Sequence, residues 1–264
     1  MTWNLWWRFG PWELRQPAID AVVAEQRPDV LLLQEVWSEG GSGVADRLAG
    51  LLGGSAVVTA DRHAAGGGVG FHNAIVSRWP VERVETRVLP GADGTPSHRR
   101  ILLADVATPW GAWPFAATHL DYRFDESATR QAQVGAVLDA VVERRGDPER
   151  DLPVIVGGDF NAVPDSDEIR LATGRSAPPR PGVLLSDCWE HVGDDPGWTW
   201  RRDNPYQEGT AWPQRRLDYV FVSWPRPKPV GNPVAAWLAG VEPVDGIVAS
   251  DHAAVVVELT TPSS

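Results

Sequence analysis

The segment Val154–Asn161, with the sequence VIVGGDFN, joins a short apolar run to two glycines and two polar side chains. Its first three residues are β-branched, which is typical of a buried strand. Asp159 and Asn161 follow two residues apart, so in extended backbone their side chains would point the same way. We expect the two glycines to allow a sharp turn and a close approach to a substrate.

A carboxylate and an amide placed in this way suit a hydrolytic reaction. Asp159 can accept a proton from water, while Asn161 orients that water or donates a hydrogen bond to a phosphoryl oxygen. The alternative is an Asx turn that closes the strand, which is natural for Asp-x-Asn shortly before Pro164. The double glycine favours the functional interpretation, because an Asx turn does not require it.

Two other apolar runs also lead into polar side chains. Leu31–Leu33 is followed by Gln34 and Glu35, and Phe115–Ala117 is followed by Thr118 and His119. Strand ends in α/β proteins often build ligand sites, because their side chains project into a cleft from a rigid element. A polar turn explains any single case, but several cases together indicate a site.

The C-terminal region adds an acid and an imidazole. Asp251 and His252 stand directly before the apolar run Ala253–Leu259, which places both at one edge of a sheet. A catalytic histidine usually needs a carboxylate on its second nitrogen to fix its tautomer. Asp218, which precedes another apolar run, is our candidate for that partner.

Strand and helix patterns alternate along the whole length. We therefore expect one α/β domain spanning residues 1–264. Strands are predicted at Val30–Gln34, Val69–Ser77, Ile101–Ala107, Pro114–His119, Val154–Gly158, Leu217–Ser223 and Ala253–Leu259, and helices at Trp12–Gln26, Val44–Leu52 and Glu126–Arg144. Surface loops are expected at Gly91–Ser97, Ala177–Gly182 and Pro225–Pro233.

Composition excludes several functional classes. A net charge of -11 and a single lysine, Lys228, argue against tight binding of duplex nucleic acid. The lone Cys188 excludes an internal disulfide framework and a cysteine-based zinc site. Neither a transmembrane run nor a signal peptide is visible, so we expect a cytoplasmic protein, although a removed export signal would leave no trace. We also expect the protein to be a monomer.

Five segments resemble the motifs of the endonuclease/exonuclease/phosphatase superfamily, the deoxyribonuclease-I-like metal-dependent phosphoesterases. They are Thr2–Leu5, Leu33–Val36, Thr118–Asp121, Gly158–Asn161, and Leu217–Tyr219 together with Ser250–His252. They follow the family's order from residue 2 to residue 252, so the resemblance covers nearly the whole chain. It implies an α/β (α+β) four-layer sandwich, in which two packed and mainly antiparallel β-sheets are flanked by helices.

The resemblance also implies a divalent-metal cofactor, Mg²⁺, with Mn²⁺ as a possible substitute. Glu35 would be the principal metal ligand, with Asn4 beside it and Asp251 as a possible further ligand. Oxygen ligands of this kind suit a hard cation that acts on phosphate.

The remaining motif residues would carry out the reaction. The resemblance implies that Asp159 orients or deprotonates the attacking water, which Asn161 helps to place against phosphorus. His252, paired with Asp218, would donate to a non-bridging oxygen. His119 would be a second donor on the phosphate or assist the leaving group.

The loops expected to border the cleft are rich in aromatic and basic residues. Trp110, Trp113, Trp198, Trp200 and Trp212 are candidates for stacking a base, a sugar or an aromatic leaving group, although ordinary packing explains any one of them. Arg99, Arg100, Arg123, Arg201, Arg202 and Arg215 are candidates for binding a second phosphate or a carboxylate.

Three functions are compatible with these observations. The leading one is a phosphodiesterase or phosphatase acting on a small-molecule or lipid-like phosphoester. The alternative is an endonuclease or exonuclease for single-stranded or damaged nucleic acid, which a steep salt dependence of binding would favour. A binding module without activity is the third, and the complete set of motif residues argues against it.

Overall fold

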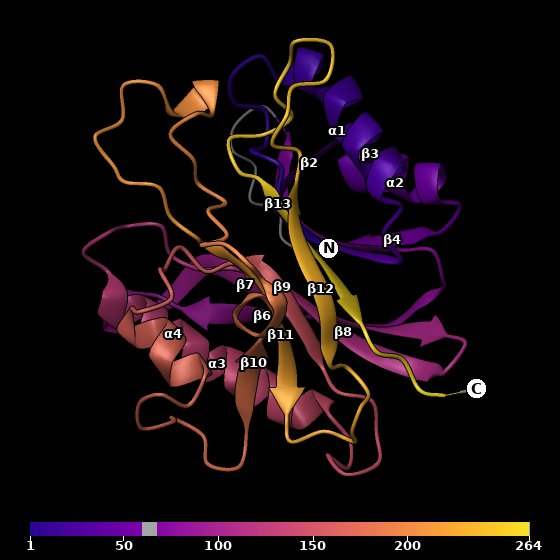
Figure 1. Ribbon diagram of the computed structural model, residues 1–264, viewed down its shortest axis with the longest axis vertical. Coiled ribbons are helices and arrows are strands. Elements are labelled where there is room, and N and C mark those ends of the chain that lie inside the picture. Colours follow the sequence, from indigo (N-terminus) through magenta and orange to yellow (C-terminus); the bar gives the residue numbers. More distant parts are fainter. Residues whose placement is uncertain (60–67, 264) are drawn as a thin grey trace.

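Two β-sheets packed face to face form the centre of the computed structural model, which describes residues 1–59 and 68–263 (Figure 1). The first sheet has the spatial order β12 (Pro233–Ala239), β13 (Ala254–Leu259), β1 (Thr2–Asn4), β2 (Val30–Glu39), β5 (Gly70–Ser77) and β4 (Ser55–Val58), with β3 (Ser42–Gly43) paired to β2. The second has the order β10 (Leu184–Asp187), β11 (Asp218–Trp224), β9 (Ile155–Asp159), β8 (Gly111–His119), β7 (Pro96–Thr108) and β6 (Val81–Pro90). Only the β1–β2 and β8–β9 pairs are parallel among the described strands.

Helices cover the outer face of each sheet. Those on the first sheet are α1 (Trp12–Gln26) and α2 (Val44–Leu52), and those on the second are α3 (Ser127–Arg144) and α4 (Asp167–Ala172). The short α5 (Cys188–Val192) and the 3-10 turns η1 (Ala92–Gly94) and η2 (Pro205–Gln207) complete the described elements. The predicted four-layer sandwich is confirmed. Within the described residues, no helix combines the length and the apolar character needed to cross a membrane.

Alternating residues of the central strands supply three separate cores. Leu31 and Leu33 of β2 pack toward α1 and α2, whereas Leu32 points between the two sheets. In the second sheet, Leu102 joins the same inner core, while its neighbours on β7 pack toward α3. Burial of each such leucine contributes about 1.5–3 kcal/mol. The period of two along these strands therefore fixes both the layering and the register.

The two helices nearest the N-terminus have the bounds that the sequence predicts, and α3 begins one residue later, at Ser127. The central strands also match, with extensions at their ends. Strands β3, β4, β6, β10 and β12 and helices α4 and α5 were not predicted. The strand β6 could not be predicted from an apolar pattern, because most of its side chains are exposed or half-buried and it has no clear apolar face. β12 begins within the expected loop Pro225–Pro233, and β7 begins within the expected loop Gly91–Ser97.

The expected turn at Gly157 and Gly158 is wrong, because both glycines lie inside β9. A Cβ on Gly158 would stand 2.2 Å from the backbone oxygen of Thr118 on β8, and one on Gly157 would stand 2.6 Å from a methyl carbon of Leu32. These distances are shorter than atoms can tolerate. The double glycine therefore permits close packing within and between the sheets.

Candidate active site

The predicted polar residues meet at one end of the sandwich, where both sheets contribute. Asn4 ends β1 in the first sheet, and Asp159 ends β9 in the second. The amide Nδ2 of Asn4 donates to Oδ2 of Asp159 at 3.1 Å. This hydrogen bond joins the two sheets directly, between residues 155 positions apart in the sequence.

Glu35 occupies a bulge within β2. The strand continues to Glu39, so the prediction that it ends at Gln34 is wrong. Its register against β5 shifts between Leu33 and Val36, and Glu35 has a left-handed φ of 52°. Such a bulge redirects a side chain without ending the strand.

Glu35 is half-buried, and its carboxylate has only half of its hydrogen bonds. Its Oε1 accepts a hydrogen bond from Asn4 Nδ2 at 3.3 Å. Its Oε2 is buried and has no hydrogen-bond partner among the residues that the structure describes. Burial raises the pKa of Glu35 above its ordinary value. An unpaired buried carboxylate oxygen is costly unless another group, such as a cation, binds it.

Asp159 uses its two oxygens differently. Oδ1 accepts from the backbone N–H of Asn161 at 2.8 Å, so the Asx turn considered as an alternative is present. Oδ2 faces the interior of the site, and burial together with the charge of Asp218 raises the pKa of Asp159 to about 6. Asn161 has a φ of 49°, and its Nδ2 donates to the backbone oxygen of Leu120 at 3.2 Å. The turn and the functional placement therefore coexist.

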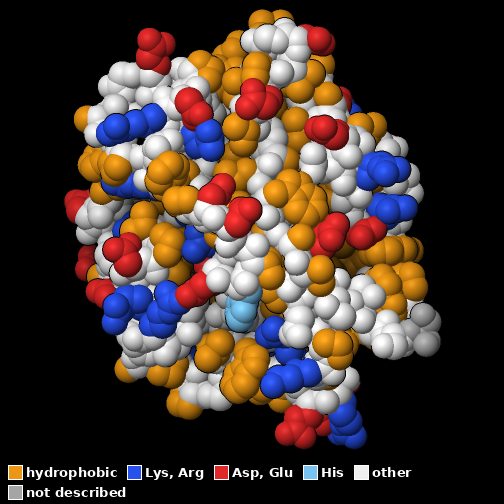
Figure 2. Space-filling view, viewed as in Figure 1, with side chains coloured by type: hydrophobic (Ala, Val, Ile, Leu, Met, Phe, Trp, Pro, Cys, Tyr) orange, Lys and Arg blue, Asp and Glu red, His pale blue; other side chains and the backbone are white. Residues whose placement is uncertain are grey.

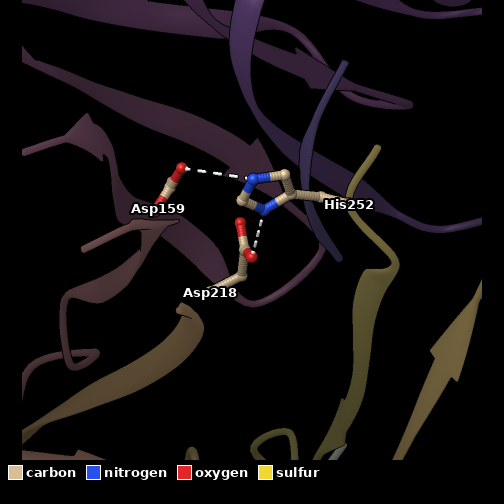
Figure 3. A group of neighbouring side chains, drawn as sticks. All are labelled: Asp159, Asp218 and His252. Atoms are coloured by element: carbon tan, nitrogen blue, oxygen red, sulfur yellow. Dashed lines mark hydrogen bonds and ion pairs between the residues drawn. The ribbon is translucent and has the colours of Figure 1, made fainter. Parts of the chain in front are cut away.

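His252 lies between two aspartates (Figure 3). Its Nδ1 is 2.7 Å from Oδ2 of Asp218, and its Nε2 is 3.9 Å from Oδ2 of Asp159. The two aspartates are directly opposite each other on β11 and β9. Burial lowers the pKa of His252, but the charges of Asp218, Asp251 and Asp159 outweigh it and hold the pKa well above its ordinary value. The structure thus places Asp218 at the second nitrogen of His252, as expected from the sequence.

His119 and Asp251 complete the group. His119 Nε2 is 3.6 Å from Oδ2 of Asp159, and its Nδ1 is buried without a partner among the described residues. Burial, reinforced by the charges of Arg99 and His252, lowers the pKa of His119 well below its ordinary value. Burial raises the pKa of Asp251 to about 7. His119 is therefore neutral at neutral pH, in contrast to His252.

These residues line a cavity of about 560 Å³. Every residue predicted for the site contributes to its wall except Asp218, which is 0% exposed and lies behind His252. The rest of the wall is rich in aromatic side chains, namely Trp6, Phe9, Phe71, Tyr122, Phe124, Trp200 and Trp212. Trp200 and Trp212 were among the candidates that the sequence indicated, whereas the other five lie outside the five motifs and were not indicated.

The candidates in the loops divide into two groups. Trp200, Trp212, Arg99 and Arg215 line the cavity. Trp110 and Trp113 do not. They line a separate cavity, where the ring of Trp110 packs against those of Trp113 and Trp79. Trp198 borders another depression, and Arg201 pairs with Asp203 on the protein itself.

Two parts of the site could bind a cation: the cluster of Asp159, Asp218 and His252, and the carboxylate of Glu35. Ligand atoms of Asp159, Asp218 and His252 lie within 4.8 Å of one another. However, the short hydrogen bond already engages one nitrogen of His252 and the carboxylate of Asp218. Glu35 offers a free buried oxygen instead, so the Glu35 side of the cavity fits a hard divalent cation better.

The sequence matches the Endonuclease/Exonuclease/phosphatase family over residues 1–252. The chain belongs to this family of divalent-metal-dependent phosphoester hydrolases, and it is an enzyme of that class. Comparison with curated protein sequences gave no match.

Solved structures share the fold. TDP2 from D. rerio, complexed with a single strand DNA product, is 21% identical with a TM-score of 0.74, and the match covers 98% of this chain and 97% of that one. Truncated TDP2 from Caenorhabditis elegans is 22% identical with a TM-score of 0.73, over 96% and 94% of the two chains. A family protein from Bacteroides vulgatus is 16% identical with a TM-score of 0.73, over 99% and 97%.

Proposed function

We propose that this enzyme hydrolyses a small phosphoester by attack of water on phosphorus, with Mg²⁺ as the preferred cation at Glu35. The buried, unpaired Oε2 of Glu35 carries the proposal, since Glu35 lines the same cavity as Asp159 and His252. Asn4, which contacts Glu35, and Asp251, which lines the same cavity, would complete the ligand set. A cavity of about 560 Å³ is in the range that holds a small molecule.

Asp159 would act on the attacking water. When bound, the cation stabilises negative charge on the phosphoryl oxygens. A pKa of about 6 leaves Asp159 ionised at neutral pH, yet basic enough to accept a proton from the attacking water. Asn161, held by its turn with Asp159, would orient that water.

The two histidines would serve as hydrogen-bond donors of different kinds. His252, held protonated by Asp218, donates from Nε2 toward a non-bridging oxygen, where charge grows in the transition state. His119 is neutral, and one of its ring nitrogens carries the proton that it can donate to the phosphate or the leaving group. Their opposite pKa shifts separate these two roles.

Single-stranded nucleic acid is a second candidate substrate. It is supported by the aromatic wall of the cavity and by the single strand DNA product bound to the D. rerio relative. The net charge of -11 argues against duplex nucleic acid. On the face drawn in Figure 2, basic side chains are interspersed with acidic and hydrophobic ones.

An activity screen with matched protein preparations tests the proposal. Nucleotides, single-stranded and duplex DNA, inositol phosphates and phospholipids would be incubated with the enzyme and Mg²⁺ or Mn²⁺. We expect turnover of a small phosphoester that disappears in Asp159→Asn, a replacement that keeps the shape of the side chain. Equal turnover by Asp159→Asn would identify a contaminant or a different base.

A further inference from the structure

A stacked aromatic pair stands at the rim of the cavity. The rings of Phe124 and Trp212 have centroids 4.0 Å apart and an interplanar angle of 29°. Phe124 is nevertheless 55% exposed and Trp212 43% exposed, and both residues line the cavity that holds Asp159. Large aromatic rings exposed together in a cavity commonly mark a binding surface.

The sheet order places this pair over the reacting end of β9. Phe124 lies in the loop that leaves β8 after His119, and Trp212 lies in the loop that enters β11 before Asp218. Because β9 lies between β8 and β11, a contact between these loops spans the end of the strand that carries Asp159. In Figure 1, the orange loop before β11 projects beyond the strand ends.

The loop that carries Phe124 is anchored. Arg130 of α3 donates from Nη1 to the backbone oxygens of Asp121 and Arg123, which begin that loop. Arg130 is itself buried, and its Nε is 2.5 Å from the carboxylate of Glu168 on α4. The aromatic pair therefore stands on a preorganised support.

Positive charge borders the pair. The guanidinium of Arg215 lies 4.8 Å from the ring centroid of Phe124 and 4.9 Å from that of Trp212. Arg215 also lines the cavity, and its guanidinium makes no ion pair with any residue that the structure describes. A flat apolar surface beside a guanidinium suits a planar π system joined to an anionic group.

We propose that Phe124 and Trp212 form a stacking subsite for a planar aromatic group, such as a nucleobase, that is joined to the scissile phosphoester. The inference rests on the proposed function, and it names the substrate class as phosphoesters of planar aromatic compounds. Arg215 lies beside the stacked group and attracts its anionic substituent. Stacking on such rings does not require hydrogen-bond recognition, so the subsite accepts different planar groups.

A lipid surface is the other class of partner that exposed aromatic residues can contact. It is less favoured here, because both rings line the cavity that holds Asp159 and share a guanidinium. Tyr122, also 62% exposed, lies under the guanidinium of Arg99 at 5.7 Å, so it too stands beside a charge. If the wild-type protein binds phosphatidylcholine vesicles and Trp212→Ala abolishes that binding, the aromatic pair contacts a lipid surface and the proposal is overturned.

Calorimetric measurement of binding affinity can distinguish the contribution of the aromatic group from that of the phosphate. The probes are phosphonate analogues of adenosine 5′-phosphate and of ribose 5-phosphate, in which a P–C bond replaces the hydrolysable ester. With Mg²⁺ present, wild-type enzyme should bind the adenosine compound about tenfold or more tightly than the ribose compound. Phe124→Ala and Trp212→Ala should reduce that ratio toward one while leaving the ribose compound's affinity unchanged.

Trp224→Ala is the matched control. Trp224 is 45% exposed, close to the value for Trp212, but it lies at the opposite end of β11 from Asp218. The Trp224→Ala variant should keep the wild-type ratio of affinities for the adenosine and ribose compounds. Equal affinities for the two probes in wild type, a ratio that survives both replacements, or no binding of either probe would overturn the subsite. Turnover of bis(4-nitrophenyl) phosphate by the wild-type enzyme is measured separately. If the wild type prefers the adenosine probe as expected but does not turn over this compound, the proposed function alone is contradicted.

Discussion

Replacing Asp218 with Asn should uncouple His252 from the carboxylate that holds its proton. The two side chains meet at 2.7 Å, and both are buried. Asparagine keeps the shape of the side chain but removes its charge, so His252 would no longer be a cation through neutral pH. Loss of one charge-stabilising donor lowers turnover about a hundredfold, which corresponds to about 2.7 kcal/mol of activation free energy.

The pH dependence gives the sign of the effect. In the wild type, neighbouring carboxylates raise the pKa of His252 well above its ordinary value, so the imidazolium persists as pH rises. Without Asp218 that pKa falls, and His252 gives up its proton at lower pH. The alkaline limb of the kcat profile should therefore move to lower pH in Asp218→Asn, as measured by steady-state hydrolysis with saturating Mg²⁺.

Asp187→Asn supplies the control for this replacement. Asp187 is 3% exposed and 2.7 Å from Arg216, so it is also a buried aspartate in a short contact with a basic side chain, but it does not line the cavity. Its replacement should lower stability without moving the alkaline limb. A wild-type rate and an unmoved limb in Asp218→Asn would show that Asp218 has no role in holding the proton of His252.

Three further replacements test the supporting structure. Gly158→Ala should lower the free energy of urea unfolding by about 1–3 kcal/mol, because the new Cβ would stand 2.2 Å from a backbone oxygen of β8. The control is Gly50→Ala in α2, whose Cβ would meet no atom within 4 Å, and it should raise that free energy by up to about 1 kcal/mol. Equal effects of the two replacements would contradict the packing argument. Arg130→Met should cost about 3–5 kcal/mol, because it leaves the buried charge of Glu168 with a hydrogen bond from Ser127 but without its opposite charge. A smaller loss would show that water reaches that carboxylate. Asn161→Ala should lower kcat about tenfold or more. It should also cost about 1–2 kcal/mol of unfolding free energy, because Asn161 has a left-handed φ of 49° and donates to the backbone oxygen of Leu120. An unchanged kcat would remove Asn161 from the water-orienting role.

Helices and strands are predicted most accurately from the sequence where the local pattern and the packing agree. Helix α2 combines apolar spacing with flanking glycines, and its predicted bounds, Val44–Leu52, are those observed. The strand before Asp159 is likewise evident from its β-branched residues. The five ordered motifs then indicated the family, the two-sheet architecture and the residues that meet at one end of the sandwich.

Other features depend on contacts that a sequence does not display. The bulge at Glu35 arises from a register shift against β5, and nothing in Leu33–Val36 indicates that the strand resumes beyond it. The stack of Phe124 on Trp212 joins loops 88 positions apart. The double glycine was assigned to a turn because the residues that its Cβ atoms would meet, Leu32 and Thr118, belong to other strands.

The most direct test of the account is a Mg²⁺ titration of phosphodiesterase activity, starting from enzyme in EDTA, for wild type and Glu35→Gln. The account predicts no turnover in EDTA, saturable recovery in the wild type, and recovery in Glu35→Gln only at much higher Mg²⁺ concentration, because the replacement removes the charge from the cation's principal ligand. Full wild-type turnover in EDTA, or the same Mg²⁺ dependence in both proteins, would contradict the assignment of Glu35 as the metal ligand.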